Sequence, residues 1–226
     1  MPGFVLQSAT GTSATTLTIT AAANGNTLIF FIAASATASR TVSSLTCTNV
    51  TWSKLVGTLN GTTFDCEIWM GKVSGGSSGT SITIAMSGGA PTVACTALEF
   101  SGTVSIKDGT GTTNTGSSTS PSTGAYSTGE SLELVLSCAG YLNGTAPTGL
   151  PGGIWTAATF AKNSTTCGVQ PCYALNGPRG SVSASFTITS ANWVTCVVAV
   201  KAPILPDKYH PLPNQPLFDI KDNVPY

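Results

Sequence analysis

The sequence carries little charge. Nine basic and nine acidic side chains make up 8% of the 226 residues and cancel to a formal net charge of zero, whereas about 25% of an average soluble protein is charged. A nucleic-acid-binding surface needs a stripe of Lys and Arg to neutralise phosphates. The composition therefore predicts no nucleic-acid partner. Because 41% of the residues are apolar and clustered, the chain is not a disordered polyelectrolyte either.

Long apolar runs and strong helix formers are also scarce. The most apolar run, residues 28–34, is far shorter than the ~20 residues that a helix needs to cross a bilayer. The first residues lack the basic start of a secretory signal. Thr, Ser, Gly and Val, which fill helices poorly, are abundant instead. We therefore expect no helical bundle, no signal peptide, no membrane partner, and synthesis in a cytoplasm.

The dominant pattern is an alternation of apolar and hydroxyl side chains with a period of two. It is clearest in residues 16–20, 81–86 and 182–189, and turn signals such as Asn60-Gly61 separate such segments. Residues 28–34 and 194–200 are apolar on both faces. They fit central strands covered on both sides, or strands at a subunit contact. The pattern predicts an all-β protein, an antiparallel β-sandwich of jelly-roll or immunoglobulin-like type.

Two segments depart from this alternation. Residues 108–129 are a low-complexity Gly/Ser/Thr stretch, which we expect to be a long loop within a single sandwich domain spanning residues 1–201. Residues 202–226 contain six of the 13 prolines and predict an extended C-terminal arm. Large apolar side chains recur along this arm and would dock onto another chain or fold back over the domain: Leu205, Tyr209, Leu212, Leu217, Phe218, Ile220, Val224 and Tyr226.

Five of the seven cysteines fall into two groups. Cys95, Cys138 and Cys196 continue the apolar faces of strand patterns and are expected to be small core residues. Cys167 and Cys172 flank a turn-like Gly-Val-Gln-Pro stretch and could close a small disulfide loop. A zinc site is disfavoured, because the chain has no C-x-x-C pair and a single histidine.

Few residues suggest catalysis. The stretch Gly75–Gly79 matches G-x-S-x-G, but a strand pattern follows it where the nucleophile motif requires a helix. Asp65, Glu67 and Trp69 would share one face of a strand, which suggests a sugar-binding site. Alternatively, Asp65 and Glu67 are ordinary solvent-facing residues. We expect no catalytic residues, no cofactor and no metal, with a sandwich-fold glycosidase as the least favoured function.

Several stretches together are similar to β-sandwich proteins of bacteriophage virions: NGNTLIFFIAASA, VTWSKLVG, CEIWMGKVSGGSSGTSITIAMSG, ALEFSG and ANWVTCVVAVKA. This resemblance covers residues 15–201. It implies a non-enzymatic structural component of the particle: a capsid decoration (cement) protein, a head-fibre base or a tail adhesin. The expected partners are the major capsid protein or neighbouring copies in an oligomer or lattice. The alternative is a carbohydrate-binding module or a tail or fibre adhesin.

Overall fold

The computed structural model describes residues 5–12, 15–36, 38–88, 91–102 and 106–201. These residues form sixteen β-strands arranged in antiparallel sheets, so the predicted all-β class is confirmed. No helix occurs in the described ranges, and hence none long and apolar enough to cross a membrane. The predicted arm, with its eight apolar residues from Leu205 to Tyr226, lies outside the described residues.

The first half of the chain supplies two sheets. A five-stranded sheet has the order β1-β8-β3-β6-β5, and a three-stranded sheet has the order β2-β7-β4. The strands are β1 (Val5–Gly11), β2 (Thr16–Thr18), β3 (Thr27–Ser35), β4 (Val42–Thr46), β5 (Val50–Asn60), β6 (Phe64–Val73), β7 (Ser81–Met86) and β8 (Thr92–Phe100).

The second half supplies two further sheets and repeats this order. A six-stranded sheet runs β12-β14-β11-β16-β9, with β13 paired to β14, and a small sheet joins β10 to β15. Thus β9, β16, β11 and β14 correspond to β1, β8, β3 and β6. The strands are β9 (Ile106–Ser118), β10 (Tyr126–Thr128), β11 (Glu133–Tyr141), β12 (Thr156–Ala157), β13 (Ala161–Asn163), β14 (Cys167–Gly177), β15 (Gly180–Val182) and β16 (Ala191–Lys201).

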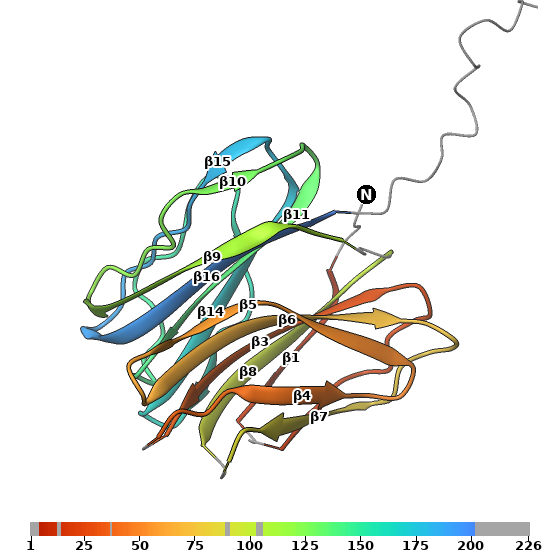
Figure 1. Ribbon diagram of the computed structural model, residues 1–226, viewed down its shortest axis with the longest axis horizontal. Helices are drawn as coiled ribbons and strands as arrows, with labels where there is room; N and C mark the ends of the chain where they lie inside the picture. The colour runs from red at the N-terminus through yellow and green to blue at the C-terminus, as the bar shows by residue number, and fades with distance from the viewer. Residues whose placement is uncertain (1–4, 13–14, 37, 89–90, 103–105, 202–226) are drawn as a thin grey trace, which may run out of the picture.

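The sheets stack in layers (Figure 1). The two large sheets pack face to face and enclose a central core to which both halves of the chain contribute. The sheet β2-β7-β4 covers the outer face of the first large sheet, and the strands β10 and β15 lie over the outer face of the second. Each large sheet is therefore a middle layer, with apolar side chains on both of its faces.

This layering explains the strands that are apolar throughout. Ile29, Phe31 and Ala33 of β3 point into the central core, while Leu28 and Phe30 pack beneath the β2-β7-β4 sheet. In β16, the even-numbered residues from 194 to 200 enter the central core, and residues 197 and 199 pack against the β10 and β15 layer. The prediction of central strands covered on both sides is confirmed, and the cover comes from the same chain.

Residues 108–129 do not form the long loop that their composition predicts. Residues 106–118 form β9, which pairs with β16 along its length at the edge of the second large sheet, and Tyr126–Thr128 forms β10. Gly, Ser and Thr suit a loop, but an edge strand pairs on one side only and needs few large side chains. The backbone ladder, rather than apolar packing, therefore orders this stretch.

Candidate functional site

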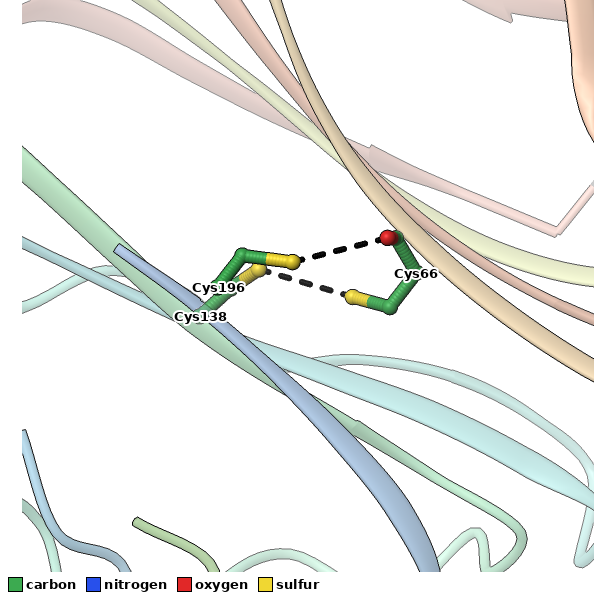
Figure 2. A group of neighbouring side chains, drawn as sticks. All are labelled: Cys66, Cys138 and Cys196. Carbon is green, nitrogen blue, oxygen red and sulfur yellow. Dashed lines mark hydrogen bonds between the residues drawn. The ribbon is translucent and has the colours of Figure 1, made fainter. Parts of the chain in front are cut away.

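Three cysteines that lie far apart in the sequence meet in the central core (Figure 2). Cys138 of β11 and Cys196 of β16 are direct cross-strand neighbours, and Cys66 of β6 reaches them from the opposite sheet. The Sγ atoms of Cys66 and Cys138 are 3.5 Å apart, and the Cys196 thiol donates to the carbonyl oxygen of Cys66 at 3.5 Å. All three are fully buried. We call this group the thiol cluster.

The thiol cluster has the donors of a site for a soft metal ion, because its three sulfur atoms lie within 4.8 Å of one another. Three sulfur ligands suit thiophilic ions such as Cu(I). Metal binding, however, requires thiolates, and burial raises the pKa of the Cys138 thiol well above its usual value. The pKa of Cys66 is raised as well, whereas hydrogen bonds with Cys138 and Cys66 lower the pKa of Cys196 to about 6. Two of the three thiols therefore hold their protons and pack as small apolar groups. The expectation that Cys95, Cys138 and Cys196 are core residues is confirmed, because each is fully buried.

The possible disulfide between Cys167 and Cys172 does not form. The two residues are five positions apart on β14, a strand that runs through the stretch interpreted as a turn. Side chains five positions apart on a strand point to opposite faces. Cys167 accordingly enters the central core, while Cys172 packs on the outer face of the same sheet, and both are free thiols.

Thiol labelling checks this assignment. Six of the seven cysteines are buried and Cys47 is half-buried, and all seven are free. We expect one thiol per native chain to react with iodoacetamide, and seven after denaturation without reductant. Mass spectrometry of the labelled protein counts the adducts. Five adducts after denaturation would instead reveal one disulfide.

A second group forms on β6. As predicted, Asp65, Glu67 and Trp69 share one face of this strand, but that face lies beneath the β2-β7-β4 sheet. The exposed fractions are 1% for Asp65, 0% for Glu67 and 8% for Trp69. Neither sequence interpretation fits this burial: the carboxylates do not face solvent, and Trp69 does not present an open ring on which a sugar could stack.

The polar contacts of Glu67 are specific. Trp69 Nε1 donates to Glu67 Oε2 at 2.5 Å, and the backbone N–H of Val42 on β4 donates to Oε1 at 3.3 Å. Lys54 Nζ of β5 lies 2.8 Å from Oε1. Burial, together with the neighbouring charge of Glu67, raises the pKa of Asp65 to about 10, so that Asp65 holds its proton at neutral pH. We call Lys54, Asp65, Glu67 and Trp69 the carboxyl cluster.

Sequence reasoning missed Lys54. The Asn60-Gly61 turn predicts that β5 and β6 form a hairpin, but it does not give the register at Lys54. Counting outward from this turn places Leu55 opposite Trp69, but a β-bulge between Lys54 and Val56 shifts the register by one residue, so that Lys54 pairs with Trp69 instead. A residue two positions from Trp69 on the same face, such as Glu67, is then within reach of a lysine side chain.

Comparison of the chain with protein-family models, curated proteins and solved structures finds no significant match.

Proposed function

We propose that this chain is a non-enzymatic structural protein of a virus particle, a capsid decoration protein held to its neighbours by residues 202–226. The supporting observation is how few large apolar side chains the described domain leaves exposed. In the described residues, the large exposed ones are Leu6, Leu132, Leu150 and Ile154. Residues 205–226, which lie outside the described residues, carry eight large apolar side chains in their sequence, from Leu205 to Tyr226. The layered domain covers its central strands by itself, so the segment is the part of the chain best suited to a partner.

The strand order supports the same class of protein. The orders β1-β8-β3-β6 and β2-β7-β4 follow the connectivity of a jelly roll, although β5 pairs with β6 instead of extending the smaller sheet. The second half repeats most of this order. We therefore infer the jelly-roll type rather than the immunoglobulin type. Jelly rolls recur in viral capsid proteins and in lectins.

The segment follows directly on a strand whose last residue is held by ion pairs. Lys201 ends β16, and its Nζ atom lies 3.0 Å from Glu130 Oε1 and 3.6 Å from Asp108 Oδ1. The segment that follows is rich in proline, which reduces the conformational entropy lost when a chain docks. The partners would be neighbouring copies of the chain or the major capsid protein, in an oligomer or a surface lattice of the virion.

Removal of the segment tests the proposal. We expect the full chain to self-associate or to bind capsid shells, and a chain ending at Lys201 to remain a folded monomer that does neither. Size-exclusion chromatography with light scattering measures the first property, and co-sedimentation with shells the second. Because each large sheet is covered within residues 5–201, circular dichroism should show the same β-rich fold in both chains.

A full-length variant provides the matched control. Replacing Leu212, Leu217, Phe218 and Ile220 by serine keeps the length and the prolines but removes apolar surface, and should abolish association as the deletion does. If the full chain is instead a monomer that binds no shell and whose C-terminal segment resists protease, the segment packs on its own domain and the proposal is overturned. Trp69 offers no exposed platform that favours glycan binding.

A further inference from the structure

The ion pair between Lys54 and Glu67 lies in an unusual place. Its carboxylate is fully buried, whereas the lysine side chain is 39% exposed and enters from the edge strand β5. Taking a carboxylate out of water is unfavourable unless a partner compensates for the lost hydration. A buried carboxyl group held against an amine is also a pair of functional groups that can condense, provided that water is excluded and the carboxyl carbon is activated.

The other contacts of Glu67 provide that activation. The Trp69 and Val42 N–H groups donate to its two oxygen atoms at 2.5 and 3.3 Å. They withdraw electron density from the carboxyl carbon and stabilise the negative charge that develops when a nucleophile attacks it, as the donors of an oxyanion hole do. Gly57 lets β5 approach closely, because a Cβ atom there would lie 2.8 Å from Glu67 Cγ.

Asp65 supplies an acid. It lies two residues before Glu67 on the same face of β6, is 1% exposed, and interacts electrostatically with both Glu67 and Lys54. Its raised pKa, caused first by burial, keeps it protonated at neutral pH. A buried, protonated carboxyl group next to a reacting carboxyl can give a proton to a leaving oxygen and take one back from an attacking amine.

We propose that Lys54 and Glu67 condense to an intramolecular isopeptide bond, with Asp65 relaying the proton. The Lys54 ammonium loses two protons as Nζ forms a bond to Glu67 Cδ. The bond from Cδ to Oε1 breaks, and Oε1 leaves as water with those two protons, one of them passed through Asp65. Oε2, held by Trp69, becomes the amide oxygen. Nothing is oxidised or reduced, and one water molecule is the only by-product.

Proximity favours this reaction at Lys54. Fixing two reacting groups in contact corresponds to effective concentrations of roughly 10⁵–10⁸ M. The pair formed by Lys201 and Glu130 offers a comparison: its Nζ–Oε1 distance is 3.0 Å, but the Glu130 side chain is 51% exposed. Solvent surrounds that carboxylate, and the pair should remain ionic. The bond would tie the edge strand β5 covalently to β6.

Intact-mass and peptide analysis of the purified full chain test the inference. We expect a mass one water molecule below that of the sequence. After trypsin digestion, residues 41–72 should remain a single peptide, uncut at Lys54 and lighter by one water. Replacing Lys54 by arginine should abolish the loss, since a guanidinium is a poor nucleophile, and Asp65→Asn should slow it at least tenfold. Lys201→Arg is the matched control and should retain the loss.

Two results would overturn the inference. One is a wild-type protein whose mass equals that of its sequence, with separate peptides 41–54 and 55–72. The other is a water loss that maps elsewhere, for example to cyclisation at Asp108-Gly109. Both are read from the wild-type chain, so neither depends on the folding of a variant.

Discussion

Replacing Phe31 by alanine is expected to lower the free energy of unfolding by about 3–5 kcal/mol, the usual cost of deleting a buried phenylalanine. Phe31 is fully buried on β3, in the core between the two large sheets. Its neighbours come from both halves of the chain and belong to strands paired on either side, so they cannot close readily around the cavity. Urea unfolding followed by tryptophan fluorescence measures the loss.

The adjacent residue makes this experiment a test of the layering. Phe30 is equally buried but points to the opposite face of β3, beneath the β2-β7-β4 sheet. Because both faces are covered, Phe30→Ala should cost about the same 3–5 kcal/mol. Leu6, which is 55% exposed on the edge strand β1, is the control, and its alanine variant should differ by no more than about 0.5 kcal/mol. A large loss at only one of the two phenylalanines would contradict the four-layer arrangement.

Asp65→Asn is expected to stabilise the protein at pH 7 and to flatten the dependence of its stability on pH. The pKa of Asp65 rises from 3.8 to about 10 on folding, because the side chain is buried next to Glu67. Between these values the folded state holds a proton that the unfolded state releases, so stability falls as the pH rises. The slope is about 1.4 kcal/mol per pH unit. From pH 5 to pH 7 the loss is about 2–3 kcal/mol, and the asparagine variant should lack it.

Unfolding by urea at pH 5, 6 and 7 measures this slope. Both chains should carry Lys54→Arg, which keeps a positive charge beside Glu67 and removes the amine required by the proposed isopeptide bond. Other groups that change protonation, such as Glu133 with its pKa raised to about 7 by burial, contribute equally to both chains and cancel in the difference. Parallel pH profiles for the two chains would show that Asp65 is ionised in the folded protein.

Much of the fold follows from local sequence pattern. Alternation with a period of two predicted strands, and the residues that are apolar on both faces predicted strands inside a stack of sheets. The same rule places Asp65, Glu67 and Trp69 on one face of β6, as the structure confirms. It holds because successive side chains of a strand point to opposite sides regardless of what covers them.

The errors come from segments whose composition fits two structures. Residues 108–129 look like a loop, yet the part up to Ser118 belongs to the edge strand β9, which pairs with β16. The stretch from Cys167 to Cys172 looks like a turn because it holds Gly168 and Pro171, yet it is the beginning of β14 between β11 and β13. In both places, backbone hydrogen bonds to a strand distant in the sequence stabilise an extended conformation, although the residues themselves only weakly prefer a strand.

The sequence by itself therefore determined the all-β class, the alternation of faces and the strands that lie deepest. Only the tertiary structure decided what each face meets: Cys66 against Cys138 and Cys196, Lys54 against Glu67, and one half of the chain against the other. The physical reason is that side-chain period is a local property of the extended backbone. The choice of partner depends on which sheets stack, and stacking is settled by apolar burial summed over the whole chain.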